Sequence, residues 1–177
     1  MKRLQNVVCF SIVLAFLCFA GCRIEKPQDT EGVQEASNAE ALAADELFLK
    51  RVYRNQQGWV MPVRLHVPEP YDPGKRYPLI LYLHGAGKRG TDNLSHLTGT
   101  DQWGSHIWIT PEHEQDYPCF VLVPQCGSGR LWQNLGSADL SWELQSVLFI
   151  MQDVQGKYSI DPDRLYITGY SMGSYGT

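Results

Sequence analysis

The sequence of 177 residues has little net charge, few cysteines and no long apolar segment, and each shortage excludes a class of protein. A net charge of −4 and the lack of a basic stripe exclude the electrostatic footprint of a nucleic-acid-binding protein. The longest apolar run, residues 7–20, is too short for a comfortable membrane span. What is present, 44% hydrophobic and 11% aromatic residues, fits one domain with a packed core.

The N-terminus has the pattern of an export signal. Two basic residues precede the apolar run, which ends in Phe-Ala-Gly-Cys at residues 19–22. This ending is similar to a bacterial lipobox, in which cleavage precedes a cysteine that then carries lipid, although Phe19 stands where leucine is usual. The alternative is an ordinary signal peptide cut nearby. Both alternatives predict an exported protein, and the first predicts a lipid anchor on Cys22.

Composition divides the chain into three segments. Residues 1–21 are the predicted signal peptide of the lipoprotein type. Residues 22–47 are rich in Glu, Gln, Ala and Asn, which is typical of a flexible, solvated tether, with a short helix over residues 39–48 as the alternative. Residues 48–177 are the predicted folded domain.

Hydrophobic periodicity predicts an α/β domain with a mostly parallel sheet and an antiparallel hairpin at its start. Three buried strands follow the hairpin, and a helix with apolar residues at helical spacing precedes the last of them. Ser137 or Asp139 is the predicted helix cap, and a loop-rich stretch extends to about Pro118. The predicted elements are the hairpin strands 49–53 and 61–67 around Gln57 and Gly58, the strands 77–83, 120–123 and 165–170, and a helix of about residues 140–158.

The two cysteines of the predicted domain, Cys119 and Cys126, stand at the ends of one predicted strand. Seven residues of extended chain span roughly 23 Å, which is far beyond the reach of a disulfide. Neither cysteine has metal-ligand spacing with a second Cys or His. We therefore expect two buried free thiols.

A Gly-x-Ser-x-Gly motif at residues 169–173 predicts a nucleophilic serine, Ser171. The motif stands where the last predicted strand ends, and the nucleophile elbow of serine hydrolases is a strand-to-helix turn. Small neighbours let strand and helix approach each other while the serine takes a strained backbone conformation. The backbone N–H of Met172 is then one predicted donor to the oxyanion. A tight turn with an incidental serine is the less favoured alternative.

The loop after the strand at residues 77–83 supports this interpretation. It reads His-Gly-Ala-Gly at residues 84–87, and parallel strands place their carboxyl ends at one edge of the sheet, so loop and elbow should meet there. We expect His84 to brace the loop through hydrogen bonds. Residues 85–90 also match Gly-x-Gly-x-x-Gly, which can cradle a dinucleotide. The predicted loop delays any helix after the third glycine, which disfavours nucleotide binding.

Four segments together resemble secreted bacterial carboxylesterases of the α/β-hydrolase fold. The related groups are polyhydroxybutyrate-depolymerase-like enzymes, the phospholipase/carboxylesterase group and prolyl-oligopeptidase-type catalytic domains. The resemblance covers about residues 48–177, and the segments are residues 77–87, 90–93, 123–126 and 163–173. It implies Ser171 as nucleophile, Met172 as one oxyanion donor and Ala86, or alternatively Gly85, as the other, with no metal and no cofactor. Ser174 stands where these families often have glycine.

In α/β-hydrolases the catalytic acid and histidine follow the serine in chain order. All five histidines of this sequence precede Ser171 and have no recognised metal spacing; they are His66, His84, His96, His106 and His113. The sequence therefore predicts the N-terminal portion of an α/β-hydrolase sheet, ending just after the nucleophile elbow.

The combined expectation is an exported, membrane-anchored serine esterase that acts on a small or polymeric ester through an acyl-enzyme. Trp103, Trp108 and Trp132 either stack on a sugar or aromatic acyl group or cover the sheet edge. Three alternatives stay open: a prolyl-oligopeptidase-type peptidase, half of a split protein completed by a partner chain, and a non-enzymatic lipoprotein or inactive gene fragment.

The polypeptide of residues 22–177 should be inactive and poorly folded on its own, because the strand before Ser171 would be an exposed hydrophobic edge. Thermal melting followed by circular dichroism tests the folding, and ester hydrolysis tests the activity. A soluble polypeptide that melts cooperatively would contradict the first expectation. Ester turnover that Ser171→Ala abolishes would contradict the second.

Overall fold

The structure is a computed structural model that describes residues 30–55, 58–99 and 102–177. The chain divides into two compact units, Met1–Glu35 and Ala36–Thr177, and the features described below belong to the second, apart from the start of the first helix. The predicted signal peptide and Cys22 lie outside the described residues. Within the described ranges, no helix has both the length and the apolar character needed to cross a membrane.

Helix α1 (Thr30–Leu47) occupies much of the segment for which composition predicts a flexible tether. The short helix considered as the alternative falls largely within it. Ala and Glu favour helix formation even where few apolar side chains are available for burial. Ala44 and Phe48 are both buried, so the C-terminal turn of α1 is fixed to the domain that follows.

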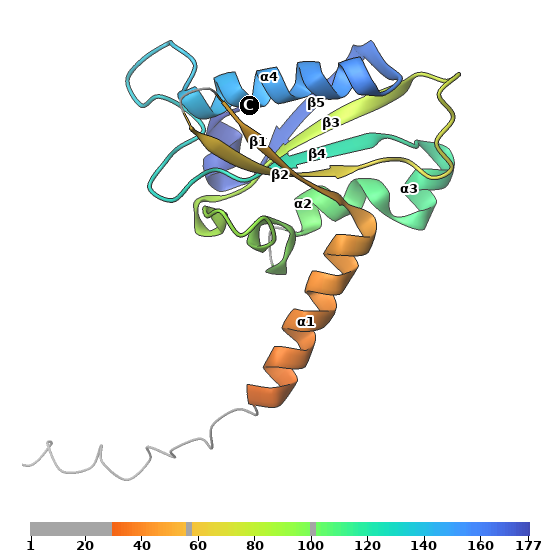
Figure 1. Ribbon diagram of the computed structural model, residues 1–177, viewed down its shortest axis with the longest axis horizontal. Coiled ribbons are helices and arrows are strands. Elements are labelled where there is room, and N and C mark those ends of the chain that lie inside the picture. The colour runs from red at the N-terminus through yellow and green to blue at the C-terminus, as the bar shows by residue number, and fades with distance from the viewer. Residues whose placement is uncertain (1–29, 56–57, 100–101) are drawn as a thin grey trace, which may run out of the picture. The chain divides into compact units, whose positions relative to one another are not determined.

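Five strands form one mixed sheet in the order β1-β2-β4-β3-β5 (Figure 1). The β1–β2 hairpin and the β2–β4 pair are antiparallel, whereas β4–β3 and β3–β5 are parallel. The predicted α/β sheet with an N-terminal antiparallel hairpin is therefore confirmed. The strands are β1 (Leu49–Arg54), β2 (Val60–His66), β3 (Tyr77–Leu83), β4 (Phe120–Pro124) and β5 (Ile160–Gly169).

Central strand β3 is apolar almost throughout because both of its faces are buried. Side chains alternate across a strand, so Leu79, Leu81 and Leu83 join the core on one face, and Ile80 and Tyr82 join the core on the other. Strand β4 continues both cores in the same way. The near-continuous hydrophobic run in the sequence thus marks a strand between two layers of packing.

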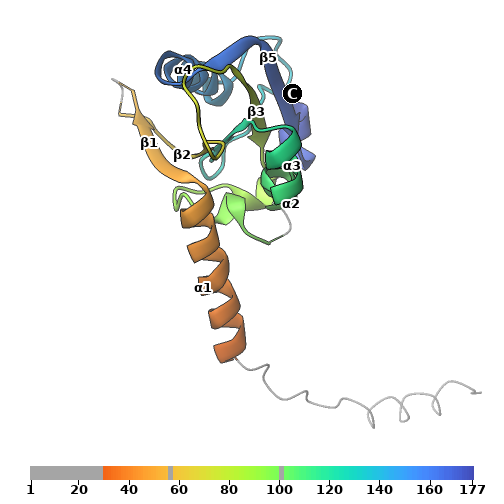
Figure 2. The same ribbon diagram turned by 90° about the vertical axis from the view of Figure 1, so that its right-hand side faces the viewer.

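Helix α4 (Trp142–Lys157) covers one face of the sheet, and short helices cover the other (Figures 1 and 2). Val147, Ile150 and Val154 are the buried apolar residues of α4. The opposite face carries α2 (Gln102–His106) and α3 (Pro111–Asp116), in the stretch predicted to be loop. Helices of five and six residues are too short to give a readable hydrophobic period.

The predicted cap of α4 was wrong. Ser141 is the N-cap, and its Oγ accepts a hydrogen bond of 3.0 Å from the backbone N–H of Leu144. Ser137 and Asp139 hydrogen-bond each other in the loop that precedes the helix. Three polar residues close together in sequence all suit a cap, and only the path of the loop selects one of them.

Strand β5 begins at Ile160, five residues before the predicted start, and lies at the edge of the described sheet. Leu165, Tyr166 and Ile167 expose 37%, 55% and 47% of their surface. The sequence pattern predicts a strand buried on both faces, whereas here both faces of its apolar segment are only partly covered by described residues. β5 is therefore an apolar edge strand that ends at Gly169, two residues before Ser171.

Candidate active site

Ser171 stands at a sharp turn between β5 and the short 3₁₀ helix η5 (Ser171–Tyr175). Its φ of 51° is in the left-handed region, which is sparsely populated by residues other than glycine. Hydrogen bonds on both sides fix this conformation: Tyr170 N donates to Leu83 O at 3.1 Å, and Gly173 N donates to Tyr170 O at 2.8 Å. Ser171 is exposed at the surface of this turn.

The two glycines of the motif are required by close backbone contacts. A Cβ on Gly169 would lie 2.4 Å from the carbonyl carbon of Gly173. A Cβ on Gly173 would lie 1.8 Å from the carbonyl oxygen of Leu83, the last residue of β3. No side chain fits at either place, so the motif lets the elbow fold onto itself and onto the end of β3.

The loop after β3 forms the second wall of the site. It contains a 3₁₀ turn, η1 (Ala86–Lys88), which lies against η5. The structure therefore brings together the elbow and the loop that the sequence predicts to meet. Met172 directly follows Ser171 in η5, and Ala86 begins η1 after Gly85. Their backbone N–H groups remain the predicted oxyanion donors.

His84 braces this loop through hydrogen bonds, as expected. Its Nε2 accepts the backbone N–H of Cys126 at 2.9 Å, which places the ring proton on Nδ1, and Nδ1 donates to Gly85 O at 2.7 Å. The carbonyl oxygen of His84 accepts the indole N–H of Trp132 at 3.0 Å. Both rings are fully buried, so Trp132 is a structural residue and does not stack on a ligand.

Gln125 is an organising residue of the same loop that the sequence analysis missed. Its Oε1 accepts the backbone N–H of Asn93 at 2.8 Å. Its Nε2 lies 3.0 Å from Ser95 Oγ, 3.1 Å from Asp92 Oδ1 and 3.3 Å from Lys88 O. Gln125 immediately follows β4, and a polar residue directly after a buried strand was the available signal.

Asp92 and Arg64 add charged contacts to this network. Burial raises the pKa of Asp92, but hydrogen bonds from the backbone of Ser95 and Leu94 and from side chains outweigh it and lower the pKa to about 2. Arg64 is buried, and its Nε donates to Asn93 O at 2.7 Å while a terminal nitrogen lies 2.6 Å from Asp45 Oδ1. These contacts fix the path of the loop rather than offer reactive groups.

The Gly-x-Gly-x-x-Gly pattern of this loop does not open a helix at its third glycine. Gly90 N instead donates to Cys126 O at 2.9 Å, and the chain continues through the turns around Asp92. A dinucleotide-binding loop needs the N-terminus of a helix at this point. The structure therefore gives the nucleotide alternative no support.

The histidines other than His84 are engaged away from Ser171. His66 Nε2 lies 2.5 Å from Glu114 Oε1, and His96 is buried with its pKa lowered to about 3 mainly by that burial. His106 and His113 contact Gln102 and Thr110 within their own helices and caps. Among the described residues, no group of His, Cys, Asp or Glu has the arrangement of a metal site. Nor does a side chain of the described ranges hydrogen-bond Ser171 Oγ.

Cys119 and Cys126 are both free and buried, which confirms the prediction from their spacing. Burial raises the pKa of Cys119 to about 11 and that of Cys126 to about 12. Thiols with such pKa values are protonated and unreactive at neutral pH. Ser171 is therefore the better nucleophile candidate in this part of the fold.

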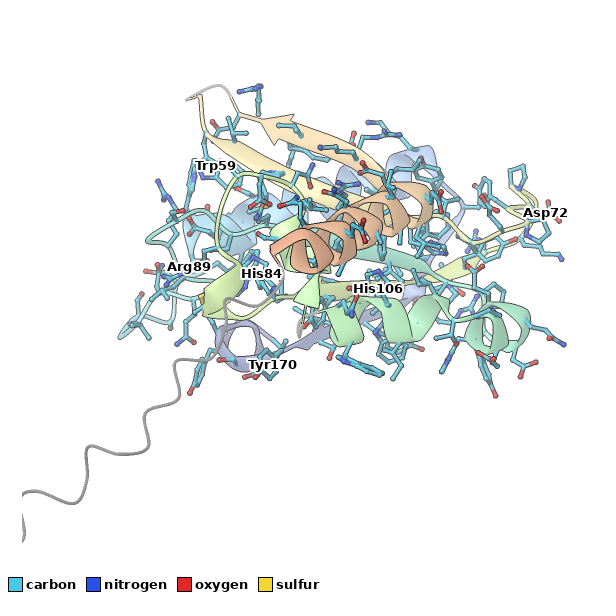
Figure 3. The ribbon with its side chains drawn as sticks, turned by 90° about the horizontal axis from the view of Figure 1, so that it is seen from below. Trp59, Asp72, His84, Arg89, His106 and Tyr170 are labelled. Carbon is cyan, nitrogen blue, oxygen red and sulfur yellow. The ribbon has the colours of Figure 1, made fainter. Side chains whose placement is uncertain are left out.

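Figure 3 shows His84, Arg89 and Tyr170 toward one end of the molecule and Asp72, which precedes β3, toward the other. The candidate site thus lies at the carboxyl ends of the parallel strands, where ligands bind in open α/β sheets.

Comparison with solved structures identifies this architecture. A thermostable esterase superposes with a TM-score of 0.70 and 37% sequence identity, over 76% of this chain and 37% of the esterase. The chain has an α/β-hydrolase esterase fold. The feruloyl esterase module of Clostridium thermocellum, crystallised as an S954A mutant with sinapinate, shares the fold at a TM-score of 0.52 and 19% identity, over 71% of this chain and 45% of the module.

A curated relative agrees with this esterase fold. The bifunctional acetylxylan esterase/xylanase XynS20E of Neocallimastix patriciarum is 28% identical over 122 residues, which are 68% of this chain and 16% of the relative. No protein-family model matches the chain. The chain spans less than half the length of each of these relatives.

The turn at Ser171 should not tolerate a side chain at Gly173. Gly173→Ala should lower the free energy of unfolding by about 3 kcal/mol or more, because the new Cβ overlaps the carbonyl of Leu83. Urea unfolding of the natural protein measures the change. The matched variant Gly156→Ala, in α4 with no atom within 4 Å of the added Cβ, should be neutral or stabilising. Equal stability of the two variants would contradict the described packing.

Proposed function

We propose that the protein is a carboxylic ester hydrolase that uses Ser171 as its nucleophile. The observation that carries the proposal is the strained serine turn packed against the loop after β3, at the carboxyl edge of an esterase-fold sheet. A backbone outlier held by surrounding contacts is typical of functional positions.

In the proposed reaction, Ser171 Oγ attacks the ester carbonyl and forms an acyl-enzyme, which water then releases. The N–H groups of Met172 and Ala86, or Gly85 in place of Ala86, stabilise the oxyanion. One such donor is worth about 3–4 kcal/mol of transition-state stabilisation. The bracing by His84 and Gln125 fixes the loop that supplies the second donor before substrate arrives.

The proposal requires a general base within hydrogen-bond reach of Ser171. In the part of the chain that the structure describes, each of the five histidines hydrogen-bonds a partner other than Ser171. An experiment therefore has to show whether a base activates Ser171. A probe that reacts only with an activated serine answers this question, because it labels Ser171 only when the base is in place.

We further propose that the ester is carried on a polysaccharide. The support is the sequence relationship to an acetylxylan esterase/xylanase, together with the esterase likeness at 37% identity. Export, which residues 1–22 suggest, would give the protein access to such polymers outside the cell.

A fluorophosphonate probe should label the natural protein, at whatever length its gene encodes, on Ser171. Ser171→Ala should abolish labelling and lower the rate of aryl acetate hydrolysis by about a thousandfold or more. Ser137→Ala is the matched control, because Ser137 lies in an exposed loop, and it should behave as the unmodified protein. Labelling that persists in Ser171→Ala, or a folded natural protein that takes no label, would refute the proposal.

The proposed lipid anchor has a separate test. Cys22→Ser should move the protein from the membrane fraction to the soluble fraction, because a stable anchor needs the acyl chains. The control Cys18→Ser changes a cysteine inside the predicted signal peptide and should stay with the membrane. A Cys22→Ser protein that remains in the membrane fraction would contradict lipidation at this residue.

A further inference from the structure

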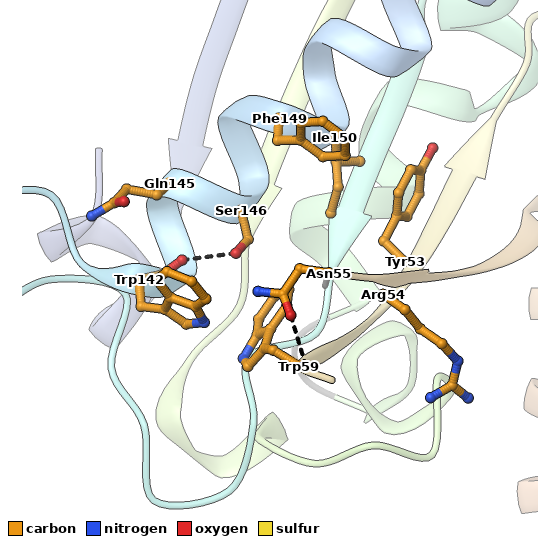
Figure 4. Close-up of a pocket in the computed structure, with 9 residues that line it drawn as sticks. All are labelled: Tyr53, Arg54, Asn55, Trp59, Trp142, Gln145, Ser146, Phe149 and Ile150. Carbon is orange, nitrogen blue, oxygen red and sulfur yellow. Dashed lines mark hydrogen bonds between the residues drawn. The ribbon is translucent and has the colours of Figure 1, made fainter. Parts of the chain in front are cut away.

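A pocket of about 220 Å³ lies between the β1–β2 hairpin and the first half of α4 (Figure 4). It is smaller than the pockets of about 300–1,000 Å³ that enclose drug-sized ligands, and it is open to solvent on one side. Its walls combine aromatic rings with side-chain amides and a hydroxyl. The lining residues used below are Asn55, Trp59, Trp142, Gln145, Ser146 and Phe149.

Two of the aromatic rings that line the pocket are exposed to solvent. The indoles of Trp59 and Trp142 meet edge to face, with ring centres 6.4 Å apart and planes at 86°. Trp59 packs partly against the main core, which accounts for its own position. Trp142 and Phe149 expose 39% and 65% of their surface beside it. These two rings present apolar faces that the described chain leaves uncovered.

Hydrogen bonds within the walls hold the pocket in shape. Asn55 Oδ1 accepts the backbone N–H of Trp59 at 2.8 Å, and Ser146 Oγ donates to Trp142 O at 2.8 Å (Figure 4). Gln145 Nε2 donates to Leu140 O at 2.9 Å, and its side chain is exposed. Among the described residues that line the pocket, none carries a carboxylate, and Arg54 is the charged member. A neutral ligand with apolar faces and hydroxyl groups, namely a sugar ring, matches this surface.

The pocket opens at the same edge of the sheet as Ser171. Strand β2 runs antiparallel to β4, so the start of β2 lies beside the end of β4, and α4 begins after β4 at that edge. The strand order places β2 three strands from β5, which corresponds to about 14 Å at the usual strand spacing. A ligand that reaches from the pocket to Ser171 is therefore an extended chain and not a single acyl group.

We propose that this pocket is a glycan-binding subsite that holds a polysaccharide while an ester on the same polymer reaches Ser171. The delivery to Ser171 rests on the proposed esterase function, whereas glycan binding itself does not. Stacking on Trp142 and Phe149 supplies the affinity, and the amides of the rim supply hydrogen bonds to sugar hydroxyls.

Affinity electrophoresis of the natural protein in native gels with and without soluble arabinoxylan tests the subsite. The polymer should retard the protein, and Trp142→Ala and Phe149→Ala should each weaken the affinity about fivefold or more. Phe149→Ala is the safer variant for folding, because Phe149 is exposed in mid-helix and alanine favours helix.

Tyr117→Ala is the matched control, since Tyr117 is 73% exposed at the end of α3 and does not line the pocket; it should be retarded like the unmodified protein. An unmodified protein that migrates equally in both gels would overturn the subsite, as would equal retardation of all variants. Ser171→Ala should also be retarded. Retardation without fluorophosphonate labelling would refute the esterase proposal and leave the subsite proposal intact. Labelling without retardation would refute the subsite and leave the esterase proposal intact.

Discussion

The backbone N–H of Tyr170 donates to the carbonyl oxygen of Leu83, and Gly173 packs against the same carbonyl. This junction joins the carboxyl ends of two parallel strands. It holds Ser171 at a positive φ and sets the elbow against the loop that begins at His84. The loop in turn is ordered by buried hydrogen bonds from the end of β4. The candidate site is thus a product of backbone contacts at one edge of the sheet, and few side chains are free to vary there.

The parts predicted correctly from sequence are those with a strong local signal. Strand β3 was predicted with its observed bounds because both of its faces are buried, and the Gly-x-Ser-x-Gly turn was placed at the end of β5 because steric demands leave no other residues possible. The parts missed depend on distant partners. Gln125 and Arg64 act on a loop about 30 residues away in sequence, and no periodicity records such contacts.

Three segments lie at the edge of the sheet where the parallel strands have their carboxyl ends. They are the hairpin between β1 and β2, the loop after β3, and the start of α4 after β4. The antiparallel β2 is what brings the hairpin to this edge, because it reverses the direction of the chain beside β4. Without that reversal, Trp59 and Trp142 would lie at opposite ends of the sheet. The same topology that places Ser171 also places an aromatic surface at this edge of the sheet.

Arg64 contacts Asp45 and the carbonyl of Phe48 at the end of α1, and the carbonyl of Asn93 in the loop after β3. One buried guanidinium therefore binds oxygen atoms of two segments that are remote in sequence. If either segment left, the buried guanidinium would lose hydrogen-bond acceptors, which is unfavourable. We therefore expect the amides of the last turn of α1 and of this loop to open together in native-state hydrogen exchange.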